Sequence, residues 1–175
     1  HTLEETEKSP EAGVARVVIA MTDPDPRTNG AGIEKLRAAG IEVTTDILKA
    51  DAQTLSRGFV LRTTKCRPLV TLKIAQSADG FTARAPGESR WITGEEARRF
   101  GQLLRVQHDA ILVGIETVIA DDPELTVRLP GLAKYAPLRV VLDSKLRLNP
   151  KSKLAQTARE TPAMVFTTRE GTEDL

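Results

Sequence analysis

The stretch from Ser77 to Arg128 holds most of the residues in this chain whose types and spacing suit binding chemistry. Glycines and aspartates mark its loops, and Arg105 and Arg128 each follow an apolar run. Two guanidinium groups and the hydroxyl of Ser89 could hold a phosphate through charge-assisted hydrogen bonds. Taken alone, both arginines are more typical of solvated surface positions, and Arg105 could instead balance its helix dipole.

Further candidate groups follow expected strands, where open α/β sheets bind their ligands. They are the turn Ser77–Gly80, the segment Gly114–Thr117, the loop Asp121-Asp122-Pro123 and the pair Asp143-Ser144. Gly114 permits the close approach of a phosphate, the N–H groups of a helix start attract anions, and Thr117 could add a hydroxyl. This segment is no GxGxxG fingerprint, however, and an ordinary strand-to-helix turn explains it at least as well.

Aspartate, aromatic and histidine side chains in the chain allow more than one interpretation. Asp121 and Asp122 could bind a ribose or a metal, but aspartates before proline are ordinary loop formers. Trp91, the only tryptophan, could stack on a heteroaromatic ring or lie in the core. His1 and His108 have no second ligand at metal spacing, and no Ser-His-Asp or Cys-His constellation occurs. The residues themselves therefore assign no catalytic group and no metal ligand.

Alternating strand and helix signals predict an α/β fold with parallel strands. The expected strands span residues 13–21, 41–44, 69–75, 109–113, 139–143 and 163–166. The expected helices span residues 31–39, 51–61, 93–107 and 114–120. Gly40 suits the C′ position after the first helix, and Thr93 with Glu96 fits a capping box at the start of the third.

The composition excludes several classes of protein. The chain has 175 residues and a formal net charge of +1, so it lacks the broad positive field of a nucleic-acid binder. Cys66 is the only cysteine, which rules out an intramolecular disulfide and a thiolate-rich metal site. No apolar run approaches the roughly 20 residues that span a bilayer, and the first residues lack a signal-peptide pattern. We therefore expect a soluble, cytoplasmic protein with one domain, or one domain and part of a second.

As an ordered set, the motifs resemble one family. The stretches TLKIAQSADGFTARAPGESRWITGEEAR, LLRVQHDAILVGIETVIADDPELTVR and RVVLDS are similar to the reductase domain of the bifunctional riboflavin-biosynthesis deaminase/reductase. The upstream GVARVVIAMTDPDPRTNGAGIEKLRAAGIEV and LSRGFVLR resemble the last part of its deaminase domain. The resemblance implies a partial, cytidine-deaminase-like α/β domain over residues 1–66, followed by the first part of a dihydrofolate-reductase-like domain over residues 67–175.

The resemblance also implies a reaction and a set of site residues. The ribose of 5-amino-6-(5-phosphoribosylamino)uracil would be reduced to ribityl by NADPH, with hydride going to the sugar C1′. By matching motifs, NADPH would face Ala75, Trp91, Thr117, Asp121 and Ser144, and the substrate would face Ser89, Arg105, Leu125 and Arg128. In that arrangement the arginines fix C1′ by holding the phosphate. The sequence offers no obvious general acid.

Two parts of the family pattern are absent from this sequence. The His-Ala-Glu motif and the paired cysteines of the zinc site do not occur, so we expect no metal and no deamination here. Zinc is expected only in the missing part of the deaminase domain. A later glycine-rich NADPH loop and an acidic substrate-binding residue are absent too.

The resemblance further implies a homo-oligomer. Two other functions stay open at this point. One is a non-catalytic remnant that binds nucleotide or supports assembly through exposed strand edges. The other is a dihydrofolate-reductase-like enzyme that acts on folate.

Overall fold

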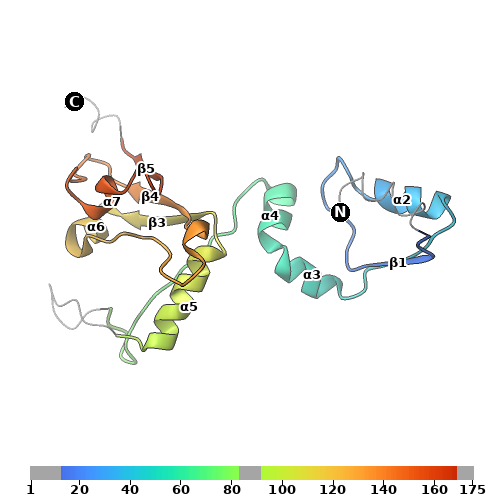
Figure 1. Ribbon diagram of the computed structural model, residues 1–175, viewed down its shortest axis with the longest axis horizontal. Coiled ribbons are helices and arrows are strands. Elements are labelled where there is room, and N and C mark those ends of the chain that lie inside the picture. The colour runs from blue at the N-terminus through green and yellow to red at the C-terminus, as the bar shows by residue number, and fades with distance from the viewer. Residues whose placement is uncertain (1–12, 83–91, 169–175) are drawn as a thin grey trace. The chain divides into compact units, whose positions relative to one another are not determined.

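Parallel strand pairing occurs in both halves of the chain (Figure 1). The structure, a computed structural model, describes residues 13–82 and 92–168. The chain forms two compact units, His1–Leu72 and Lys73–Leu175. Each unit combines helices with a parallel sheet, which confirms the predicted α/β class.

The first unit contains a pair of short parallel strands. Strand β1 (Arg16–Ile19) pairs in register with β2 (Glu42–Thr45), and helix α2 (Ala31–Ala38) connects them and packs against β2 (Figure 1). The strand predicted over residues 13–21 is therefore shorter than expected. It is not buried either, because Val18 is 55% exposed.

Gly40 ends α2 as the sequence predicts. Its φ of 78° lies in the left-handed region that favours glycine. The Gly40 N–H donates to the Arg37 carbonyl (3.0 Å) and the Ile41 N–H donates to the Leu36 carbonyl (3.1 Å), which is the Schellman pairing. Leu36 and Ile41 are only 6% and 5% exposed, so the end of the helix also contributes the buried apolar groups of this unit.

The single helix expected over residues 51–61 is two helices, α3 (Lys49–Leu55) and α4 (Arg57–Lys65). Ser56 separates them, with φ −100° and ψ 18° outside the helical range. Serine is a weak helix former and Gly58 lies two residues further on, so the local sequence has little preference for a continuous helix across Ser56.

The loop after β1 turns at Asp25. Its Oδ1 accepts the backbone N–H of Arg27 (2.9 Å), and both carboxylate oxygens accept from Nε of the Arg27 guanidinium (3.0 and 3.1 Å). The side-chain hydrogen bond from Arg27, followed by the backbone one, lowers the pKa of Asp25 from 3.8 to about 2. The Asp25 carbonyl accepts from the N–H groups of Thr28 and Asn29, so this turn leads into α2.

The first unit is expected to lose stability in acid through Asp25. The pKa of Asp25 is lower in the folded chain than in the unfolded chain. Its contribution to the stability of the folded unit is therefore present above pH 3.8 and is lost as the pH falls to about 2. Hydrogen exchange of α2 amides in the wild type and in Asp25→Asn measures this, and the difference should shrink below about pH 4. The exposed Asp51, changed to asparagine, is the control. A difference that does not depend on pH would contradict the assignment.

The second unit contains a three-stranded parallel sheet in the order β3-β4-β5 (Figure 1). Strands β3 (Ala110–Gly114), β4 (Leu138–Leu142) and β5 (Ala163–Phe166) lie within one residue of their predicted positions. A short 3-10 turn, η1 (Ala133–Tyr135), falls in the loop before β4.

Helices α6 (Ile115–Asp121) and α7 (Lys153–Gln156) pack against one face of this sheet. The core between them consists of Ile115, Val118, Leu125, Val141 and Leu154. Full burial of a leucine such as Leu154 contributes about 1.5–3 kcal/mol, so this small cluster stabilises the unit substantially.

Helix α5 (Glu95–Val106) begins two residues after the start of its predicted range. Gly94 is its N-cap residue, and no side chain caps the first turn. The Thr93 carbonyl instead accepts from Arg98 Nη1 (2.7 Å). The predicted Thr93–Glu96 capping box is therefore wrong, and the carboxylates of the first turn favour the helix start through its dipole instead.

The apolar run over residues 69–75 does not form the predicted strand. It lies outside any helix or sheet, and Val70, Leu72 and Ile74 are 78%, 81% and 57% exposed. The alternation supplies strand propensity, but a strand also needs a hydrogen-bonded neighbour. No strand of the described chain pairs with this run.

Candidate functional site

Two arginines far apart in the sequence lie together in the second unit. Arg105 is in the last turn of α5, and its Nη1 donates to the Thr126 carbonyl (2.6 Å). Arg128 is two residues further along, and its backbone N–H donates to Gln102 Oε1 (3.0 Å). One face of α5 thus contacts the segment that carries Arg128 at two points.

The two guanidinium groups form a candidate anion site. Burial, and then the positive charge of Arg128, lowers the pKa of Arg105. No carboxylate within residues 13–82 or 92–168 forms an ion pair with either arginine. Like charges held close together favour the binding of an anion between them. A phosphate is the group that such a pair suits best, because guanidinium groups donate to it in pairs.

The segment Glu124–Arg128 has no helix or strand of its own. The Glu124 carbonyl accepts from Arg139 Nη1 (3.0 Å). Leu125 and Val127 are 6% and 4% exposed while Arg128 is exposed, so buried and more exposed side chains alternate from Leu125 to Arg128.

Leu125 does not present its side chain to solvent. It belongs to the core cluster, and its φ of 56° is unusual for a residue of this size. The prediction that Leu125 faces the substrate can therefore apply only to its backbone.

Two of the predicted cofactor residues share a face of α6. Thr117 and Asp121 are one helical turn apart and exposed, whereas Ile115 and Val118 are buried. No hydrogen bond or ion pair from the described part of the chain engages either exposed side chain. The neighbouring Asp122 differs, because its Oδ1 accepts the backbone N–H of Lys153 (2.9 Å).

Ser144 follows β4 at the edge of the sheet where Gly114 ends β3. Its carbonyl accepts from Thr168 Oγ1 (2.8 Å) and Thr167 Oγ1 (3.2 Å), while its side chain stays exposed. The preceding Asp143 is fully buried, and its Oδ2 accepts the N–H of Leu148 (2.8 Å). These contacts fix the backbone of the turn that presents Ser144.

The candidates thus fall into two groups, one beside α5 and one on α6 and after β4. No hydrogen bond or ion pair among the described residues joins the two groups. Ala75 is half-buried and precedes the predicted turn, which forms with Gly80 N–H donating to the Ser77 carbonyl (2.9 Å). Ser89, Trp91 and His1 lie outside the described residues.

The sequence interpretation missed the residues that hold these groups in place. Gln102 and Arg139 bind the backbone of the segment Glu124–Arg128. The Arg147 guanidinium pairs with Glu116 and so ties the turn after β4 to α6. One signal was present for Arg139, because a charged residue interrupts the apolar run of β4. Nothing in the sequence marks Gln102.

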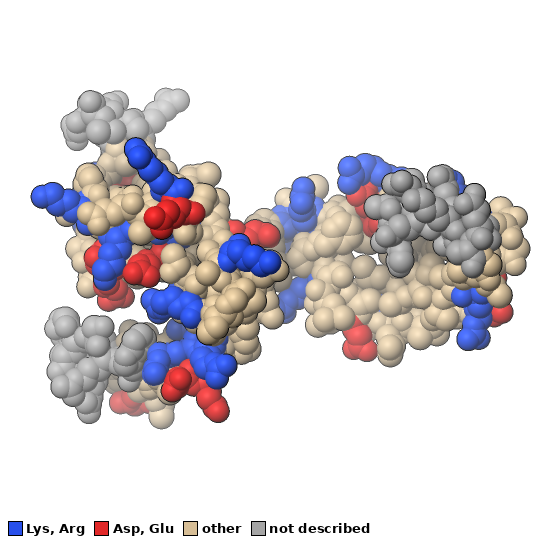
Figure 2. Space-filling view, viewed as in Figure 1, with Lys and Arg blue, Asp and Glu red and all other residues tan. Residues whose placement is uncertain are grey.

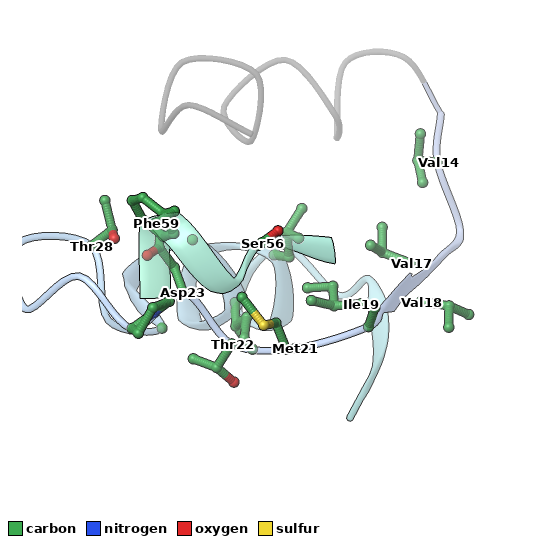
Figure 3. Close-up of a pocket in the computed structure, with 16 residues that line it drawn as sticks. Val14, Val17, Val18, Ile19, Met21, Thr22, Asp23, Thr28, Ser56 and Phe59 are labelled. Carbon is green, nitrogen blue, oxygen red and sulfur yellow. The ribbon is translucent and has the colours of Figure 1, made fainter. Parts of the chain in front are cut away.

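A cavity of about 540 Å³ lies in the first unit among β1, the loop after it, α2 and α4 (Figure 3). Its walls are mostly apolar, and none of the predicted substrate or cofactor residues lines it. Its acidic residue, Asp23, accepts the backbone N–H of Asp25 through Oδ1 (2.9 Å) and so belongs to the turn. The residues that line this cavity therefore include neither of the two arginines and none of the candidate cofactor residues.

Figure 2 shows positive and negative side chains intermingled on the visible face of the second unit, so that face carries no broad positive field. Within the described ranges, no group of three or more His, Cys, Asp or Glu residues could hold a metal ion. No helix in these same ranges has the length and apolarity to cross a membrane.

The second unit is an α/β domain whose exposed polar candidates lie on helices and turns that follow parallel strands. Residues 68–175 match the family described as RibD C-terminal domain. The chain belongs to this family, which confirms the resemblance on which the sequence interpretation relied.

Named relatives are similar over most of this chain. The riboflavin biosynthesis protein RibD of Aquifex aeolicus is 43% identical over 159 residues, which cover 91% of this chain and 44% of the relative. The RibD of Escherichia coli is 44% identical over 161 residues, which cover 86% of this chain and 44% of the relative.

Two solved structures resemble the fold. RibD of Acinetobacter baumannii, form 1, has a TM-score of 0.82 and 39% identity, and the match covers 96% of this chain and 48% of that one. The diaminohydroxyphosphoribosylaminopyrimidine deaminase/5-amino-6-(5-phosphoribosylamino)uracil reductase of Thermotoga maritima has a TM-score of 0.84 and 38% identity, with 94% and 46% covered. The chain therefore spans about half the length of the relatives it matches.

Proposed function

We propose that this chain takes part in the NADPH-dependent reduction of 5-amino-6-(5-phosphoribosylamino)uracil, in which the ribose becomes ribityl. The observation that carries the proposal is the pair Arg105 and Arg128, held side by side with no ion-paired carboxylate from the described residues. A sugar phosphate suits this pair, and the Thermotoga maritima relative is named as a reductase of this phosphoribosyl compound.

In this proposal, the two arginines hold the substrate phosphate through charge-assisted hydrogen bonds. Fixing the phosphate restricts the sugar, so that C1′ stays within reach of the hydride donor. Bound NADPH would supply the hydride. Thr117, Asp121 and Ser144 would hold the cofactor, since their side chains are exposed and polar. Ala75 and Trp91 complete the proposed cofactor contacts, and Ser89 with the backbone of Leu125 completes the substrate contacts.

We assign residues 1–66 to the end of a deaminase domain and residues 67–175 to the first part of the reductase domain. Zinc-dependent deamination is proposed only for a longer form of the protein. Within the described residues, Cys66 is exposed and no group of three or more His, Cys, Asp or Glu side chains could hold a metal ion. We also propose a cytoplasmic homo-oligomer, which light scattering of the purified protein would test.

A non-catalytic role in assembly is the second candidate, and one observation favours it. On the face of the sheet away from α6 and α7, Leu112, Leu142 and Phe166 are 59%, 48% and 54% exposed. An apolar face of this kind is typical of surfaces that become covered by other protein.

Oxidation of NADPH in the presence of the phosphoribosylaminouracil distinguishes the two functions. We expect oxidation that depends on this substrate, and none with dihydrofolate. The assay should use this chain and the longest form that its gene encodes, because the candidate site can depend on residues beyond position 175. Folded protein that oxidises no NADPH in either form would leave the assembly role as the better explanation.

A further inference from the structure

The segment Glu124–Arg128 depends on neighbouring side chains for its backbone hydrogen bonds. The Glu124 and Thr126 carbonyls are half-buried and need partners, whereas the Arg128 N–H is exposed. No strand among the described residues lies beside this segment to supply these bonds. Arg139 satisfies the Glu124 carbonyl, Arg105 satisfies the Thr126 carbonyl, and Gln102 satisfies the Arg128 N–H. The position of Arg128 is thus determined by long-range side-chain contacts.

The two contacts from α5 fit an extended segment. Gln102 and Arg105 are three residues apart, so they lie on the same face of the helix. In an extended chain, the C=O of one residue and the N–H of the second residue after it point to the same side. The Thr126 carbonyl and the Arg128 N–H meet this condition, and Gln102 and Arg105 together replace a missing neighbour strand.

We propose that Gln102 is a positioning residue for substrate binding, a step that rests on the proposed function. Its Oε1 accepts the Arg128 backbone N–H (3.0 Å). This bond fixes the Arg128 backbone, from which the side chain extends, beside Arg105. Without this bond, the end of the segment is free to move, and the two guanidinium groups no longer hold one phosphate together.

The absence of charge on the Gln102 amide is as important for phosphate binding as the length of the side chain, which lets it contact the Arg128 N–H. A glutamate at position 102 would accept the same N–H but would place a negative charge beside the two arginines. That charge would pair with them and compete with the substrate phosphate. Gln102→Glu therefore separates a structural role from a role in phosphate binding, because it keeps the hydrogen bond and changes only the charge.

The test measures steady-state kinetics and NADPH binding for three variants in the longest form that the gene encodes. Gln102→Ala should raise KM for the phosphorylated substrate about 3- to 10-fold, with smaller changes in kcat and NADPH affinity. Gln102→Glu should raise KM at least about tenfold while the thermal midpoint stays near that of the wild type. Gln156→Glu, which adds the same charge on α7 away from the arginines, should change neither value.

Wild-type KM in both Gln102 variants, with the fold intact, would overturn the assignment, as would an equal loss of substrate and NADPH binding. A wild-type protein that does not turn over the substrate would refute the proposed function instead. Calorimetry with inorganic phosphate then tests Gln102 separately. Weaker phosphate binding by Gln102→Ala than by the wild type supports the assignment, whereas equal binding, or no binding by the wild type, overturns it.

Discussion

Changing Arg128 to alanine is expected to lower kcat/KM for the phosphorylated substrate about 10- to 100-fold and to leave NADPH affinity within about twofold. A hydrogen bond to a charged group contributes roughly 1.5–3 kcal/mol, and the guanidinium is the part of Arg128 that the substitution removes. The backbone N–H that bonds Gln102 remains, so the segment should keep its position. The loss should therefore fall on substrate binding and not on the fold.

The Arg105→Ala variant should show a larger loss, because it removes a guanidinium and also the hydrogen bond to the Thr126 carbonyl. Kinetics with the phosphorylated substrate, together with a fluorescence titration of NADPH, measure both effects. Arg99→Ala, at an exposed position of the same helix, is the matched control and should behave as the wild type. Equal weakening of substrate and NADPH by Arg128→Ala, with the fold intact, would count against the phosphate site.

The elements that could be predicted from the sequence are those with strong local patterns. Strand β5 has its predicted bounds, and β3 and β4 lie within one residue of theirs, because short apolar runs between polar loops indicate strands. The run 69–75 has the same pattern but no neighbouring strand among the described residues. The sequence did not predict helix α7, because four residues show little periodicity. Ser152 is a typical N-cap residue and could have indicated the helix start, and in the structure its Oγ accepts the Ala155 N–H (3.3 Å).

The arginine pair could be predicted only from the motifs as an ordered set. Considered locally, Arg105 is a basic residue in the last turn of a helix, and a dipole or solvent role is the simpler explanation. Arg105 differs from an ordinary surface arginine because it donates a hydrogen bond to the Thr126 carbonyl, 21 residues away in the sequence. In the same way, the Arg128 N–H donates to Gln102, which is 26 residues away. Gln102 contacts a backbone N–H, a group that almost every residue has. The type of the residue contacted therefore gives no sign of this bond, and no local pattern could have identified Gln102.

The Arg139→Ala variant is expected to lower the free energy of unfolding of the second unit by about 3–5 kcal/mol. Arg139 lies in β4 and is fully buried. Its Nη1 donates to the Glu124 carbonyl (3.0 Å) and to Thr157 Oγ1 (2.8 Å), and its Nη2 donates to the Thr161 carbonyl. Burial lowers the pKa of this guanidinium, and the Glu124 carboxylate partly opposes that effect.

Removing the Arg139 side chain leaves two half-buried carbonyls and a hydroxyl without their donor and opens a cavity beneath the sheet. Methionine at this position should lower the free energy of unfolding by less than alanine does, because it fills much of the space while still leaving the carbonyls unsatisfied.

Hydrogen exchange of the β4 amides, together with urea unfolding, measures the loss in this unit. The exposed Arg159, changed to alanine, is the control and should change the unfolding free energy by less than about 0.5 kcal/mol. An unfolding free energy for Arg139→Ala that matches this control would show that the buried guanidinium stabilises nothing. Because Arg139 also holds the Glu124 carbonyl, the methionine variant should bind the phosphorylated substrate more weakly even where it remains folded.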